Sequence, residues 1–153
     1  MTPETLRKLT LLSGLALMLA GCLEGLAAGN MSNTKMAKSA HHQAAHNSEL
    51  LLAVAFAFPY CDLPPTLLDV AFWALQFGTW GNPCAYLVMA ATNCPNPMFL
   101  KDSELPPPGD GAGNFYTSLS MFLLMVPTSM GMFVSLILLM VGVARYKSKE
   151  KSI

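Results

Sequence analysis

The chain has 153 residues, of which 53% are hydrophobic and only 12% charged, and nine basic and nine acidic residues give a formal net charge of zero. This length corresponds to one domain, and this balance is typical of integral membrane proteins. The chain has no basic patch or Arg-rich segment, which argues against nucleic acid as a partner.

Four apolar segments follow one another along the chain. A spanning helix needs roughly 20 apolar residues, and each segment reaches this length, the second only if its polar start is counted as helix. The sequence therefore predicts an all-α integral membrane protein, with one four-helix-bundle domain over residues 1–153. The expected spans are about residues 6–28, 38–59, 66–91 and 115–146.

The first segment contains "LAGC" at Leu19–Cys22, which is similar to a lipoprotein cleavage box after a short basic region. In that interpretation residues 1–21 would be a removed signal. The apolar run continues through "LEGLAAG", however, where a lipoprotein turns polar. We therefore expect an uncleaved helix.

The second segment begins with "SAHHQAAHNSE", residues 39–49, which contains all three histidines of the chain. Ionisable groups at membrane depth are costly and by default indicate function. At 100° per residue on a helix, His42, His46 and Glu49 fall within roughly 60° of one another. They form one polar face.

The same helix also carries His41, which lies about 100° from His42, and Asn47, which lies roughly 120° from His41, so it presents two polar sides. Two polar sides indicate contact with two surroundings, such as a neighbouring subunit and the helix's own bundle. Three interpretations remain open from spacing alone. They are a hydrated helix mouth, a haem with one histidine as its axial ligand, and a divalent metal held by His42, His46 and Glu49.

The third segment contains "FGTWGNPCAY", residues 77–86. Pro83 lies mid-helix and frees a backbone carbonyl, so we expect a kink there. Asn82 and Tyr86 lie one turn apart, either as interhelical hydrogen-bonding groups or as pocket residues. Trp80 either packs or lines a pocket suited to an aromatic ligand.

The two ends of the chain, "LRK" and "RYKSKEK", hold six of the nine basic residues. With four spans, the positive-inside rule predicts that both termini are cytoplasmic. The loop over residues 93–114 then faces outward. The four cysteines show no metal-binding spacing and are expected to pack as small apolar residues.

These residues together resemble the small membrane isomerases typified by styrene oxide isomerase and their relative hydroxylaminobenzene mutase. The shared pattern is "AH" at Ala40-His41, Asn47 six residues later, "GTWGN" at Gly78–Asn82, Tyr86, and "PGD" at Pro108–Asp110. The likeness runs from about residue 39 to residue 146, and the first helix matches only in hydropathy.

Within this family the chain shows features of both members. "GT" before the tryptophan is similar to the mutase, whereas Tyr86 and "PGD" are similar to the epoxide isomerase. The epoxide isomerase carries an aspartate where Gly78 stands in this chain.

The resemblance implies a homotrimer embedded in membrane lipid, with ferric haem b bound between neighbouring subunits. His41 would be the axial ligand, and Asn47 and Tyr86 would lie beside the open iron position. Trp80, Asn82 and Asp110 would belong to the surrounding pocket.

The implied reaction is redox-neutral. The haem iron would act as a Lewis acid on the oxygen of a small apolar aromatic epoxide, and a 1,2-hydride shift would give an aldehyde. A mutase would instead convert an arylhydroxylamine to an aminophenol. A third hypothesis is a membrane protein that binds haem or metal without catalysis.

Overall fold

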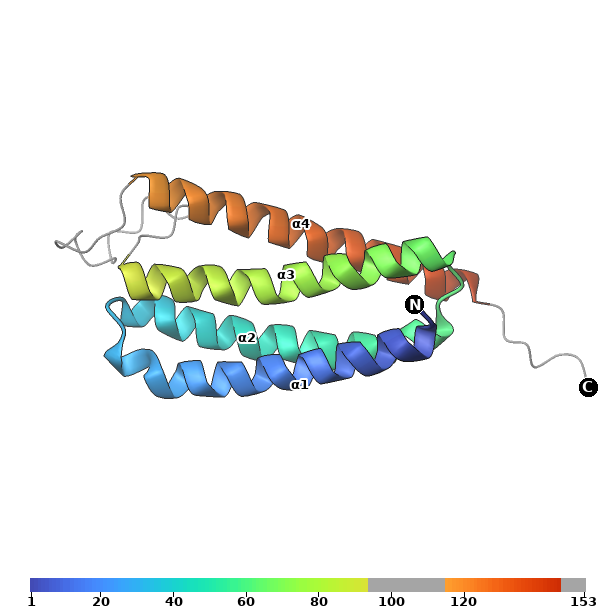
Figure 1. Cartoon of the computed structure of the whole chain (residues 1–153), viewed down its shortest axis with the longest axis horizontal. Coiled ribbons are helices and arrows are strands. Elements are labelled where there is room, and N and C mark those ends of the chain that lie inside the picture. The colour runs from blue at the N-terminus through green and yellow to red at the C-terminus, as the bar shows by residue number, and fades with distance from the viewer. Residues whose placement is uncertain (94–114, 147–153) are drawn as a thin grey trace, which may run out of the picture.

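The computed structural model of the protein describes residues 1–93 and 115–146. Within these residues four α-helices lie side by side, as Figure 1 shows, and two short 3-10 helices, η1 and η2, follow the first two of them. The α-helices are α1 (Pro3–Ala27), α2 (Thr34–Ala55), α3 (Pro65–Thr92) and α4 (Phe115–Arg145), and the 3-10 helices are η1 (Ala28–Asn30) and η2 (Phe58–Tyr60). The predicted all-α class is confirmed.

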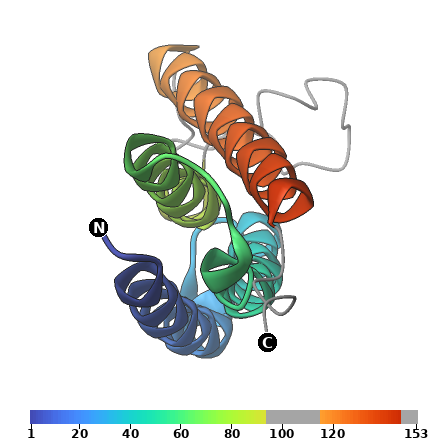
Figure 2. The ribbon, with the colours of Figure 1, turned by 90° about the vertical axis from the view of Figure 1, so that its right-hand side faces the viewer.

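Each long helix packs against the next one in the chain, α1 on α2, α2 on α3, and α3 on α4. Seen end-on in Figure 2, α1 and α2 form a pair, α3 lies against this pair, and α4 lies on the outer side of α3. The start of α1 and the end of α4 lie at the same end of the molecule (Figure 1), where the Met1 amino group pairs with Asp69 at 2.9 Å.

Helix α2 begins about one turn earlier than the sequence pattern predicts. The side chain of Asn33 accepts a hydrogen bond from Met36 N at 3.1 Å and so caps the helix start. Its other end comes at Ala55, before Pro59, which has no N–H to continue the helix. The histidine-rich stretch therefore lies wholly within α2.

Helices α3 and α4 run through their internal prolines, Pro83 and Pro127. Helix α3 has Pro65 at its first position, where the missing N–H costs nothing. It ends at Asn93, which adopts the left-handed conformation with φ 51° and donates its N–H to Met89 O.

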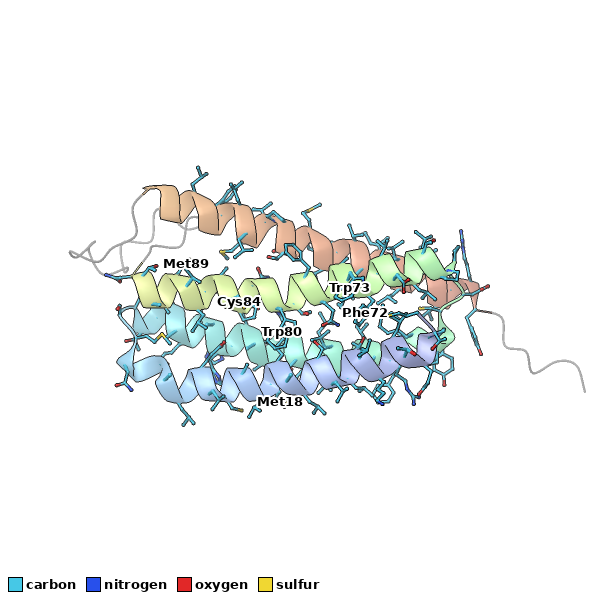
Figure 3. All side chains as sticks on the ribbon, in the orientation of Figure 1. Met18, Phe72, Trp73, Trp80, Cys84 and Met89 are labelled. Carbon is cyan, nitrogen blue, oxygen red and sulfur yellow. The ribbon has the colours of Figure 1, made fainter. Side chains whose placement is uncertain are left out.

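Large apolar side chains are exposed along the described helices. Within residues 1–93 and 115–146, two helical stretches are long and apolar enough to cross a membrane, Pro3–Asn30 and Phe122–Arg145. Large apolar side chains point outward from both stretches, among them Leu19 of α1 and Phe133 of α4. Figure 3 shows another, Met18, on the outside of α1. Exposed apolar area of this extent indicates a surface made for lipid.

Within the described residues, the buried core forms three apolar clusters along the helices. The cluster near Met1 contains Leu6, Phe58 and Phe72. The middle cluster joins α1, α2 and α3 through Leu17, Ala44, Leu51 and Leu75, with Trp80 packed against it. The third cluster, at the end where α1 turns into α2, is built around Met36, Ala85 and Met89, and Tyr86 packs against it.

Candidate functional site

His41 is half-buried on the side of α2 that faces α1. Its Nδ1 lies 2.7 Å from the backbone oxygen of Gly21. Because a carbonyl oxygen can only accept, Nδ1 must carry the proton and donate it. In the neutral ring, this tautomer leaves the lone pair on Nε2, and this is the form of histidine that ligates metals.

Two glycines of α1 allow the His41 ring to approach this closely. A Cβ on Gly25 would lie 3.0 Å from His41 Nδ1 and 3.1 Å from its Cε1. A Cβ on Gly21 would lie 3.0 Å from the Cβ of Ala44. The spacing Gly-x3-Gly places both on one face of α1, as in membrane helices that pack closely. Gly25 therefore leaves the space that the imidazole ring occupies.

A groove of about 680 Å³ opens beside His41 between α1 and α2. This volume lies within the range of roughly 300–1,000 Å³ that is usual for ligand sites. The lining residues come from the end of α1, from η1 and from the first two turns of α2, and they are Cys22, Gly25, Leu26, Ala28, Gly29, Thr34, Lys38 and His41. The groove thus combines apolar walls with one candidate metal ligand, His41.

Asn47 lies on another side of α2 and faces α3. It is only 5% exposed, and its Nδ2 donates to Thr79 O at 2.8 Å. Thr79 O is the carbonyl that a non-proline residue at position 83 would bind in an α-helix, so Pro83 leaves it without its usual partner. Asn47 thereby satisfies the carbonyl that the proline frees. In a single chain, His41 and Asn47 contact different helices.

His42, His46 and Glu49 form an exposed face of α2. His46 Nδ1 lies 3.8 Å from Glu49 Oε2, and these side chains are 76% and 69% exposed. Among residues 1–93 and 115–146, no group of three or more His, Cys, Asp or Glu side chains is arranged to hold a metal ion. The divalent-metal interpretation of this face therefore gains no support from one chain.

The remaining residues expected at the pocket occupy separate places. Asn82 accepts a hydrogen bond from Thr128 Oγ1 of α4 at 2.9 Å, and Trp80 Nε1 donates to Ser13 Oγ of α1 at 2.8 Å. Tyr86 is half-buried. Asp110 lies outside the described residues, as do Cys94 and the rest of the loop over residues 94–114.

Gly78 lies where α3 and α4 approach closely. A Cβ at this position would lie 2.7 Å from Thr128 O and 2.8 Å from Met132 N. Because both atoms belong to the backbone, a larger side chain would force the two helices apart. An aspartate, such as the epoxide isomerase carries here, would not fit this packing.

Several residues near the site were not singled out by the sequence analysis, because they belong to none of its motifs. They are Gly21 and Gly25, which seat the His41 ring, and Thr34 and Lys38 in the groove. Glu24, next to Gly25, has a buried Oε2 without a hydrogen-bond partner among the described residues and interacts electrostatically with His41. The only signal for this part of the site was the Gly-x3-Gly spacing in "GCLEG".

Cys61 fits the expectation that the cysteines pack as small apolar residues. It is buried between η2 and α3, and burial raises the pKa of its thiol above the usual value. Cys22 and Cys84 are exposed. A protonated thiol at Cys61 is unreactive, which agrees with a packing role.

An all-α chain with long, exposed apolar helices belongs with the membrane proteins. Comparison with known proteins narrows this class. Residues 6–144 match the family described as styrene oxide isomerase, and the chain belongs to this family. The family expected from the sequence is confirmed.

The chain is also similar to hydroxylaminobenzene mutase HabA from Ectopseudomonas oleovorans, with 36% identity over 70 residues. The aligned stretch covers 46% of this chain and 52% of the mutase, so the chain spans about half the length of this relative. No solved structure matches the chain.

Proposed function

We propose that the protein is a membrane isomerase that uses ferric haem b to rearrange a small aryl epoxide to an aldehyde. The observation that supports this most directly is the setting of His41. One ring nitrogen is bound to Gly21 O at 2.7 Å, the other is left for a metal, and a groove of about 680 Å³ lies beside the ring.

The bound haem would supply a Lewis acid for the epoxide oxygen. The chain's own part begins with His41, which would hold the iron through Nε2, while Gly21 O fixes the tautomer and the ring orientation. The apolar walls around Cys22, Leu26 and Ala28 would exclude water, which would otherwise trap a benzylic cation as a diol.

Asn47 and Tyr86 would orient the substrate oxygen by hydrogen bonds. Because Asn47 contacts α3 whereas His41 faces α1, a pocket that uses both residues requires a second subunit. The exposed face of His42, His46 and Glu49 supports such an assembly, since polar side chains facing lipid are costly. A homotrimer of four-span subunits with cytoplasmic termini would cover this face.

The second candidate function is that of a hydroxylaminobenzene mutase. The 36% identity over 70 residues to HabA favours it. In this case the same groove would take an arylhydroxylamine, and the product would be an aminophenol. Supplying the purified protein with styrene oxide and, separately, with phenylhydroxylamine distinguishes the two activities.

The experiment that tests the proposal is the haem content of the purified protein and of two histidine variants. We expect a haem spectrum in the wild-type chain, its loss in His41→Ala, and its retention in His42→Ala. His42 is a matched control because it is the neighbouring residue, with ring centroids 5.3 Å apart, but does not line the groove.

Three results would contradict the proposal. Loss of haem only in His42→Ala or His46→Ala would show that the ligand is misassigned. Zinc in place of haem would favour the face of His42, His46 and Glu49. A haem-loaded protein that converts neither substrate class would be a binding protein.

A further inference from the structure

The groove beside His41 has two chemically different walls. The α1 side, with η1, contributes small and apolar residues, namely Cys22, Gly25, Leu26, Ala28 and Gly29. The α2 side contributes Thr34, Lys38 and His41, which follow one another at i, i+4 and i+7 and so share one face of the helix. A ligand that fills this groove meets apolar surface on one side and polar groups on the other.

Lys38 is the cation of this groove. Between Lys8 and Lys101 the sequence has only two basic residues, Lys35 and Lys38, and of these two only Lys38 lines the groove. Among residues 1–93 and 115–146, no carboxylate forms an ion pair with Lys38. Its charge is therefore available to a ligand.

Thr34 adds a second group that favours an anion. It is the first residue of α2, where backbone N–H groups lack helical partners and the helix dipole is positive. Its hydroxyl can also donate a hydrogen bond. The end of the groove near the α1–α2 connection thus combines a cation, a hydroxyl and a helix N-terminus.

We propose that Lys38, together with Thr34, binds the carboxylates of the cofactor whose iron His41 would hold. The groove would then recognise a planar apolar ligand that carries acid groups at one edge, which is the chemistry of haem b with its two propionates. This inference rests on the proposed function, because it names the residues that recognise the cofactor's acid groups.

Haem-binding titrations of the detergent-solubilised protein test this inference. The ligands are haem b and the dimethyl ester of the same iron porphyrin, in which both carboxylates are blocked. The variants are Lys38→Ala, Lys38→Arg and Lys35→Ala. The last is a matched control because it removes the same charge from the same end of α2 without altering the groove lining.

We expect Lys38→Ala to raise the Kd for haem about fivefold, the upper end for an exposed ion pair. The Kd for the ester should not change in this variant, and Lys38→Arg and Lys35→Ala should bind haem as the wild-type chain does. A Lys38→Ala variant with unchanged haem affinity overturns the inference. Equal weakening of haem and ester also overturns it, because the effect is then structural. A wild-type chain that binds no haem overturns the proposed function and the inference with it.

Discussion

At the scale of single residues, the contact between Asn47 and Thr79 raises the question whether Asn47 serves structure or catalysis. Its amide satisfies the carbonyl that Pro83 leaves without a partner in α3. An unpaired buried carbonyl costs about 1–3 kcal/mol. Asn47 therefore has a structural task, whether or not it also orients a substrate.

A double variant separates the two roles of Asn47. Asn47→Ala should lower the free energy of unfolding in detergent by about 1–3 kcal/mol. Adding Pro83→Ala restores an N–H for Thr79 O and should recover most of this loss. If Asn47 also orients substrate, the double variant regains stability but not turnover per haem. Recovery of both would contradict a catalytic role.

The sequence alone predicted part of this arrangement. Helical spacing placed His41 and Asn47 on different sides of one helix, and the structure places them against α1 and α3. The position of Pro83 predicted a freed carbonyl. Its partner could not be predicted, because spacing within one helix does not show which residue of a neighbouring helix lies opposite.

At the scale of elements, α1 has a larger role than its sequence indicated. This helix resembles the family only in hydropathy. In the structure, however, its backbone accepts a hydrogen bond from His41, and its glycines leave the space that the imidazole ring occupies. The hydrogen bond to His41 is accepted by a backbone oxygen, that of Gly21, and the ring fits against α1 because Gly25 has no side chain. A search for polar motifs does not detect either feature, so this half of the site was missed.

The α1–α2 contact gives a prediction with a matched pair of variants. Gly25→Ala places a methyl group 3.0 Å from His41 Nδ1, so the ring must shift. Overpacking of this kind costs about 1 kcal/mol or more, which corresponds to roughly a fivefold loss of haem affinity. Gly29→Ala adds a methyl group to the same groove but meets no protein atom within 4 Å, so it controls for the added methyl group without moving the His41 ring.

The measurement for this pair is the haem titration together with the absorption spectrum of the bound haem. If His41 holds the haem iron, a shifted ring should change the spectrum of Gly25→Ala even at saturating haem, because the orientation of the ligating imidazole would change. Equal haem affinity and equal spectra for Gly25→Ala and Gly29→Ala would show that haem binding does not depend on the close contact between the His41 ring and Gly25 of α1.

At the scale of the whole molecule, the helix pattern was largely predictable from hydropathy. The observed bounds of α1, α3 and α4 lie close to the expected spans. Helices α2 and α3 have polar residues among their apolar ones, and they do not pass the same length-and-composition test for a span. Some of these polar groups, such as Asn47, pair within the structure or line the groove, whereas His42, His46 and Glu49 form an exposed face, and hydropathy alone distinguishes neither case.

The last prediction concerns the retention of α1 in the mature chain. Leu6 and Leu17 of this helix are 0% and 1% exposed, and the backbone acceptor of His41 is Gly21. Cleavage before Cys22 would remove all three residues and expose the face of α2 and α3 that they cover. Both ends of the described chain also lie at one end of the molecule (Figure 1), as four spans require. We therefore expect the purified protein to retain residues 1–21, which peptide mapping by mass spectrometry checks. A mass that lacks residues 1–21 and includes a lipid on Cys22 would contradict the four-span arrangement, and the His41 site would then have to form without its seat in α1.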